Sequence, residues 1–160
     1  MINYIHVKSD FEYQQASSLF DEYSRWLNID LSFQKFEEEL ISLKKMYGGK
    51  KGTIILAVEN SIYIACVAVR PITDEIGELK RMYVQPIYQK MKIGQALLDL
   101  SIEFAINAGY TKIRLDTLDH MKPAMGLYLK NGFYKIKKAG IALTSPAAFM
   151  AWRYSPQGEN

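Results

Sequence analysis

The segment RMYVQPIYQKMKIGQALLDL, residues 81–100, decides the fold of this chain. A strand-like run at residues 82–84 meets a proline at Pro86, and a basic turn that contains Gly94 follows. An apolar run at helical spacing begins directly after the glycine. The segment therefore predicts a strand that leads through a basic turn straight into a helix.

A turn of this kind has the properties of an anion site. The first N–H groups of a helix have no partner within it, and the helix end carries about half a positive charge. Gly94 permits close approach of a ligand to the backbone, and Lys90 and Lys92 add positive charge. The segment matches neither a P-loop nor the three-glycine dinucleotide pattern. From this stretch alone, a phosphate or pyrophosphate site and a solvated basic loop with a packing glycine remain equal alternatives.

The composition bounds the class of protein. The 160 residues predict one domain, residues 1–160, and the 49% hydrophobic content is enough for a core. A net charge of +3, from 20 basic and 17 acidic residues, is too mild to imply a nucleic-acid partner. The single cysteine, Cys66, excludes an internal disulfide, and His6 and His120 lie too far apart in sequence to predict a metal cluster.

No segment predicts export or membrane insertion. The first residues, MINYIHVKSD, lack the basic start and long apolar run of a signal peptide. The longest apolar run, residues 62–69, is far shorter than the about 20 residues that a transmembrane helix needs. We therefore expect a cytoplasmic protein with no membrane partner.

Hydrophobic periodicity and turn residues predict the order of the elements. The expected elements are a strand near residues 2–6, a helix behind a capping box at Ser9 and Glu12, a helix over 33–43, strands at 53–58, 62–69 and 78–84, a helix from 94 to 108, a strand at 111–115, a helix from 123 to 131, and strands at 133–137 and 148–154. Residues 71–77 are expected to form a turn. This order predicts a mixed sheet flanked by helices, an α/β or α+β single domain.

Four motifs in order resemble the GNAT superfamily of acetyl-CoA-dependent N-acetyltransferases, in a single-domain member of the bacterial type. They are GELKRMYV, QKMKIGQALL, AGYTKIRLDT and LYLKNGF, and together they extend from about residue 53 to residue 133. The resemblance implies a mostly antiparallel central sheet in which one pair of parallel strands splays apart. It also implies direct acetyl transfer from acetyl-CoA, without a metal, to a primary amine of a small molecule or a protein.

The resemblance assigns the cofactor site to two segments and two single residues. The turn amides would hold the pyrophosphate, and the strand that ends at Val84 would pair with the pantetheine arm. A backbone N–H near Met82 would stabilise the oxyanion. The implied cofactor-binding residues are Met82, Tyr83, Val84, Gln89, Lys90, Met91, Lys92, Ile93, Gly94, Gln95, Met121 and Tyr128.

Two side chains are the implied catalytic groups. Tyr128 matches the tyrosine general acid of the family, and the alternative is a half-buried tyrosine that packs on its helix. Glu78 occupies the position of the general base in the histone-acetylating branch, and the alternative is an ion-paired residue at a strand end. Strand alternation places Glu78, Lys80, Met82 and Val84 on one face.

Departures from the family pattern keep a second function open. Lys92 stands where the family has a glycine, and Met121 stands where it often has an asparagine. Both favour the alternative of a CoA-binding regulatory or degenerate module without turnover. The acceptor pocket would use variable loops at residues 28–33 and 139–147, and His120 could also touch substrate. Trp26 could meet substrate there, although core packing is the preferred interpretation. A homodimer is compatible with the family.

Overall fold

The computed structural model describes residues 1–27, 38, 42–118, 121–137 and 147–154. Within these residues a seven-stranded sheet has the order β1-β2-β3-β4-β5-β7-β6. The elements are β1 (Ile2–His6), α1 (Asp10–Leu27), α3 (Leu43–Tyr47), β2 (Thr53–Glu59), β3 (Ile62–Pro71), β4 (Ile76–Val84), the 3-10 helix η2 (Pro86–Tyr88), α4 (Ile93–Asn107), β5 (Lys112–Leu118), α5 (Lys122–Lys130), β6 (Tyr134–Ile136) and β7 (Ala147–Arg153).

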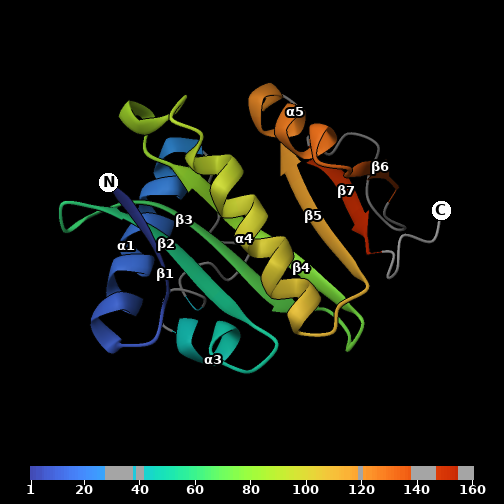
Figure 1. Ribbon diagram of the computed structural model, residues 1–160, viewed down its shortest axis with the longest axis horizontal. Helices are drawn as coiled ribbons and strands as arrows, with labels where there is room; N and C mark the ends of the chain where they lie inside the picture. The colour runs from blue at the N-terminus through green and yellow to red at the C-terminus, as the bar shows by residue number, and fades with distance from the viewer. Residues whose placement is uncertain (28–37, 39–41, 119–120, 138–146, 155–160) are drawn as a thin grey trace.

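Helices cover both faces of the sheet and divide its core into two layers (Figure 1). On one face α4 buries Ile93, Leu97 and Leu98 against the strands. On the other face α1 and α3 bury a second cluster that includes Phe20 and Tyr47. The helix α5 stands beside the end of β5 (Figure 1).

The predicted order of elements is confirmed for the described residues, where the elements differ from the prediction at their ends. β4 begins two residues earlier than predicted, because Gly77 already pairs with Pro71 of β3. β5 continues to Leu118 rather than ending at Leu115, because β7 pairs with it along its whole length. Most of the predicted helix at 33–43, His120 and the loops at 28–33 and 139–146 lie outside the described residues.

The ends of the helices are fixed by the residues that the sequence predicts. In the capping box, the Glu12 amide donates to Ser9 Oγ at 3.1 Å, and the Ser9 amide donates to a Glu12 carboxylate oxygen at 2.9 Å. The α4 helix ends in a Schellman motif at Gly109, whose φ is +91°. The α5 helix ends in the same way at Gly132, so the NGF part of the last motif is explained by a helix cap.

A bulge in β4 overturns one prediction about its faces. The pairing with β3 shifts register between Lys80 and Tyr83, and Arg81 adopts a left-handed φ of 56°. Ahead of the bulge Leu79 faces α4, whereas beyond it Tyr83 faces α1. The prediction that Glu78, Lys80, Met82 and Val84 share one face is therefore wrong. Glu78 and Lys80 lie on the α1 side, and Met82 and Val84 pack on the α4 side.

The only parallel pair among the described strands, β4 and β5, is short and then opens. Its rungs are Ile76 with Lys112, Gly77 with Ile113, and Glu78 with Arg114. Beyond Glu78, β4 continues to Val84 paired only to β3, while β5 continues to Leu118 paired only to β7. The predicted splayed parallel pair is confirmed, and it leaves the facing edges of the two strands unpaired.

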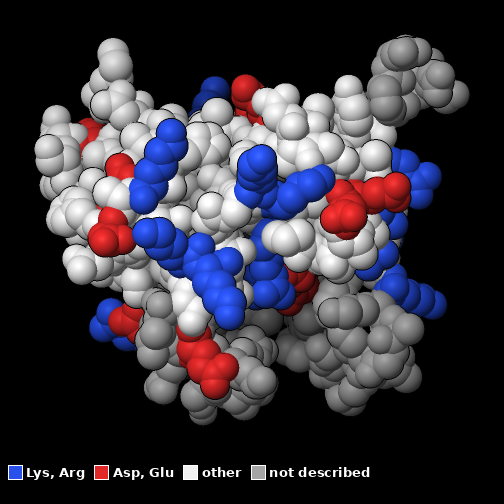
Figure 2. Space-filling model, turned by 90° about the horizontal axis from the view of Figure 1, so that it is seen from below, with Lys and Arg blue, Asp and Glu red and all other residues white. Residues whose placement is uncertain are grey.

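The end of the sheet opposite to the opening between β4 and β5 carries a basic face. Viewed from below, Lys and Arg side chains gather near the centre of this face (Figure 2). Where α4 ends, the Lys51 ammonium donates to the carbonyl oxygens of Ala108 and Asp74 and lies 4.7 Å from the centroid of the Tyr110 ring. Lys51 therefore makes structural contacts within the fold. In the described part of the chain, no helix is both long and apolar enough to cross a membrane.

One glycine inside α5 and one just after it allow the effect of a positive φ to be measured separately from the effect of packing. Gly132 has a φ of +91° with ordinary space around it, so Gly132→Ala is expected to lower the free energy of unfolding by about 1–2 kcal/mol. Gly126 lies inside the helix with nothing within 4 Å of an added methyl, so Gly126→Ala is expected to raise it by up to about 1 kcal/mol. Urea unfolding measures both variants, and effects of the same sign contradict this assignment.

Candidate functional site

The turn before α4 presents a run of unpaired backbone amides. The Gln89 amide donates to the Pro86 carbonyl, and the Ala96 amide donates to the Lys92 carbonyl. Between them, the amides of residues 90–95 have no backbone acceptor within the described chain. The helix dipole adds positive potential at the same place. This end of α4 is therefore a candidate site for an anion with several oxygens.

Two lysines hold the turn in a conformation that usually requires glycine. Lys90 has a φ of 74°, and Lys92, the N-cap of α4, has φ 62° and ψ 20°. Each costs about 1 kcal/mol or more relative to glycine. Lys92 thus keeps the backbone shape of the family glycine that it replaces, and its exposed side chain adds a positive charge beside the amides. Ile93, only 1% exposed, anchors the turn in the core.

Gly94 is not required by packing or by an unusual φ. A methyl group at this position would meet only Leu127 Cδ2, at 3.5 Å, which is an ordinary contact. The alternative of a packing glycine therefore has no support in the structure. The absence of a side chain leaves the neighbouring amides open, as close approach of a phosphate requires.

An amide pair joins this turn to α5. Gln95 Nε2 donates to Asn131 Oδ1 at 2.8 Å, and Asn131 Nδ2 donates back to Gln95 Oε1 at 3.0 Å. Asn131 also donates to the Leu127 carbonyl at 2.7 Å. The Gln95 side chain is thus directed toward α5, and only its backbone amide is available to a ligand. Neither hydrophobic periodicity nor a charge pattern in the sequence predicts this contact between residues 36 positions apart.

Tyr128 lies in α5 with its ring in the core. It is 4% exposed and packs against Phe133, with ring centroids 5.6 Å apart. No described residue accepts a hydrogen bond from its hydroxyl. Burial raises its pKa above the ordinary tyrosine value, and Tyr23 and Asp116 raise it further. The phenol is therefore protonated at neutral pH.

Glu78 is ion-paired in this structure. Its carboxylate oxygen accepts a hydrogen bond from Arg70 Nε at 2.8 Å, and its side chain is 18% exposed. It sits on the last rung of the parallel pair, opposite Arg114. The Nε atom of Arg114 is buried with no hydrogen-bond partner within the described structure. Glu78 is thus at the point where the strands part, paired with Arg70 and next to Arg114 in the register of the sheet.

The remaining predicted cofactor residues lie along or near the parted strands. Met82 and Val84 follow the bulge, on the edge of β4 that β5 leaves unpaired. Gln89 and Met91 are exposed on the turn. Met121 is the N-cap of α5, and its amide donates to the Leu118 carbonyl at 3.0 Å. Among the described residues, no group of three or more His, Cys, Asp or Glu side chains is arranged to hold a metal.

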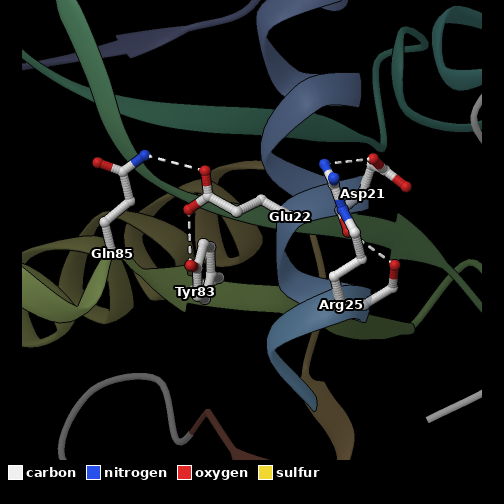
Figure 3. A network of polar contacts seen from close by, with 6 residues as sticks. Asp21, Glu22, Arg25, Tyr83 and Gln85 are labelled. Atoms are coloured by element: carbon white, nitrogen blue, oxygen red, sulfur yellow. Dashed lines mark hydrogen bonds and ion pairs between the residues drawn. The ribbon is translucent and has the colours of Figure 1, made fainter. Parts of the chain in front are cut away.

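Tyr83 has a side-chain contact that the sequence did not predict. Its hydroxyl donates to Glu22 Oε2 at 2.6 Å, and Gln85 Nε2 donates to Glu22 Oε1 at 3.2 Å (Figure 3). Asp21 on the same helix instead pairs with Arg25 at 2.7 Å. The contact joins residues 61 positions apart, so no local sequence pattern predicts it. The pocket between α1 and α3, lined by Asp10, Tyr13 and Lys44 among others, contains no predicted site residue.

Comparison with known proteins identifies the family. The sequence model described as the acetyltransferase (GNAT) family matches residues 16–133. An uncharacterized N-acetyltransferase of Schizosaccharomyces pombe is 34% identical over 129 residues, which cover 79% of this chain and 79% of that protein. The rat N-acetyltransferase 8F1 is 28% identical over 61% of this chain and 46% of its own length.

Solved structures agree on the fold. An acetyltransferase of the GNAT family from Staphylococcus aureus Mu50 superposes with a TM-score of 0.80 at 23% identity, over 96% of this chain and 99% of that one. The PaiA N-acetyltransferase from Thermoplasma acidophilum, in complex with coenzyme A, superposes with a TM-score of 0.73 at 20% identity, over 96% and 99%. The chain therefore belongs to the acetyltransferase (GNAT) family, as its motifs predict, and with it to the acyltransferase enzymes.

Proposed function

We propose that this chain transfers the acetyl group of acetyl-CoA to a primary amine. The observation that carries the proposal is the run of open amides at residues 90–95, placed where β4 and β5 have parted. The family and the coenzyme A complex of the Thermoplasma relative support the choice of cofactor. A diphosphate fits the donor set, because it presents several anionic oxygens to several N–H groups and two nearby lysines.

The unpaired edge of β4 supports the rest of the cofactor site. Its N–H and C=O groups beyond Glu78 have no partner on β5, so an extended amide-bearing chain can pair with them as a strand would. Bound acetyl-CoA supplies an acyl thioester. An amide of β4 near Met82 would stabilise negative charge on the carbonyl oxygen, an effect worth about 3 kcal/mol for one such donor.

The chain must also remove a proton from the acceptor. A lysine-like ammonium has a pKa of about 10.4, so nearly all of it is protonated at neutral pH. Glu78 is the proposed proton acceptor, acting directly or through water. Arg70 Nε holds the Oε1 atom of Glu78 at 2.8 Å, so this oxygen would accept the proton only if that contact loosens.

Tyr128 is the proposed proton donor to the leaving sulfur. The amine nitrogen forms a bond to the acyl carbon, the carbon–sulfur bond breaks, and the phenol gives its proton to the thiolate. Burial raises the Tyr128 pKa, so the proton is present on the phenol throughout the neutral range. The products are an N-acetylated amine and free coenzyme A thiol.

Two measurements test this function. Acetyl-CoA should raise the melting temperature, because a ligand that binds only the folded state stabilises it. A panel of primary amines should then release free thiol from acetyl-CoA. No shift at millimolar acetyl-CoA would overturn the proposal. A shift without thiol release for any amine would favour the alternative of a CoA-binding module without turnover.

Gly94 offers a selective test of the cofactor turn. In Gly94→Ala the added methyl should hinder close approach of a phosphate to the neighbouring amides, and lost charge-assisted hydrogen bonds should weaken acetyl-CoA binding by about 10-fold or more. The free energy of unfolding should change by less than about 1 kcal/mol, since the methyl meets only ordinary contacts. Isothermal titration calorimetry and urea unfolding measure the two effects.

Gly49→Ala is the matched control, because an added methyl there meets nothing within 4 Å and the residue lies before β2, outside the turn. It should leave acetyl-CoA affinity unchanged. Equal affinity in Gly94→Ala and the control would remove the turn amides from the cofactor site.

Tyr128→Phe tests the proton donor. The ring keeps its packing and no described partner of the hydroxyl is lost, so acetyl-CoA affinity and stability should stay nearly unchanged. We expect kcat to fall by about 10²-fold, the low end for a general acid, because a thiol with a pKa of about 8.5 is a good leaving group. Steady-state thiol release measures kcat, with the exposed Tyr134→Phe as control. Unchanged turnover would exclude Tyr128 from this role.

A further inference from the structure

A group of side chains on the α1 side of β4 is not used by the chemistry above. Glu22, Tyr23 and Trp26 come from α1, Tyr83 comes from β4, and Gln85 follows β4 (Figure 3 labels Glu22, Tyr83 and Gln85). We call these five residues the carboxylate–aromatic cluster. The bulge at Arg81 is what turns Tyr83 toward α1, so the cluster depends on the same distortion as the cofactor edge.

Three aromatic rings of this cluster stand close together. The ring centroids of Tyr23 and Tyr83 are 5.3 Å apart, and those of Trp26 and Tyr83 are 5.7 Å apart. Tyr23 and Trp26 are 6.2 Å apart and nearly parallel. Tyr83 is buried, whereas Trp26 is 43% exposed, so the group opens to solvent on the Trp26 side. Aromatic faces in such an arrangement attract cations.

The carboxylate of Glu22 is fixed in place but keeps free acceptor capacity. One oxygen accepts from Tyr83 at 2.6 Å and the other from Gln85 at 3.2 Å. Two ionised oxygens can accept about four hydrogen bonds, so about two remain for a ligand. Among the described residues, no Lys, Arg or His forms an ion pair with Glu22. In the described part of the chain, the half-buried carboxylate thus has hydrogen-bond donors but no ion-pair partner.

The cluster is close to the place where the strands part. Tyr23 raises the pKa of Tyr128, the proposed proton donor on α5, after the larger effect of burial. Tyr83 itself lies between Met82 and Val84, on the part of β4 whose edge β5 leaves unpaired, so the cluster is next to the opening. Burial raises the pKa of Tyr23 to about 12, and the positive charge of Arg81 opposes part of this rise. Burial and the hydrogen bond to Glu22 raise the pKa of Tyr83, as expected beside a negative charge.

We propose that the carboxylate–aromatic cluster binds a second cationic group of the acceptor, which is therefore a small aliphatic amine with at least two ammonium groups. This inference rests on the proposed acetyl transfer. The bound group is not the reacting nitrogen, because a carboxylate and aromatic faces stabilise the charged form and would keep that nitrogen protonated. The reacting nitrogen is at the other end of the acceptor molecule and would lie at the edge of β4. An acceptor with a carboxylate in place of the second ammonium would be repelled by Glu22.

A binding measurement tests the cation site without turnover. The chain has two tryptophans, so Trp152→Phe leaves Trp26 as the only fluorescent indole. Diaminobutane should change its fluorescence in a saturable way, and uncharged butanediol of the same length should not. In the Trp152→Phe background, the further substitution Glu22→Gln should weaken diaminobutane binding by about 10-fold or more. The glutamine amide has the shape of the carboxylate but lacks its negative charge. Glu103→Gln, at an exposed position of α4, is the matched control and should leave the titration unchanged.

A turnover measurement tests the class of acceptor. In thiol release, kcat/KM for diaminobutane should exceed that for butylamine and for aminobutanoate by about 10-fold or more. Glu22→Gln should reduce this ratio toward one, and Glu103→Gln should preserve it. Trp26→Leu, at a partly exposed site, should reduce the ratio a few-fold.

The outcomes separate the two proposals. Equal rates for diaminobutane and butylamine, or a diaminobutane titration that Glu22→Gln does not weaken, would overturn the second-ammonium inference and leave acetyl transfer standing. Preference for aminobutanoate would overturn it in favour of an anionic acceptor. Absence of thiol release with every amine would overturn the proposed acetyl transfer, and with it the acceptor class, whatever the titration shows.

Discussion

The parting of β4 and β5 after three parallel rungs is the constraint on which the rest of the structure depends. A bulge at Arg81 turns β4 away from the register it would otherwise keep, and bulges increase the local twist of a strand. This leaves one edge of β4 without a partner, places Met82 and Val84 under α4, and turns Tyr83 toward α1. A regular β4 would pair fully with β5 and would have neither the open edge nor the contact with Glu22.

Backbone strain is concentrated in the segment between the bulge and α4. Arg81, Lys90 and Lys92 each adopt a left-handed φ, at a cost of about 1 kcal/mol or more apiece. Burial of Ile93, Leu97 and Leu98 under α4 holds the segment in place, because two or three fully buried aliphatic side chains contribute several kcal/mol. Strain of this kind is found at functional sites, where the surrounding core can maintain it.

The sequence predicted the element order and the helix caps, because these have local signals such as Gly109, Gly132 or the Ser9–Glu12 box, whereas the splayed pair was implied by the family resemblance. It failed on the faces of β4, because an arginine at position 81 gives no sign of a left-handed φ. The motif segment also predicts that the turn at residues 89–95 holds the cofactor, although Lys92 stands where the family pattern has a glycine, and this stays a prediction. The Glu22–Tyr83 and Gln95–Asn131 contacts join distant parts of the chain through polar side chains, and no periodicity announces such pairs.

The central claim is that the open amides at residues 90–95 and the unpaired edge of β4 hold acetyl-CoA. Amide hydrogen–deuterium exchange with and without acetyl-CoA tests it most directly. We expect exchange to slow at residues 90–95 and along 79–84, with little change in β1 and β2, which already pair fully with each other. Saturating acetyl-CoA that leaves exchange in both segments unchanged, or that protects another part of the chain instead, would contradict the claim.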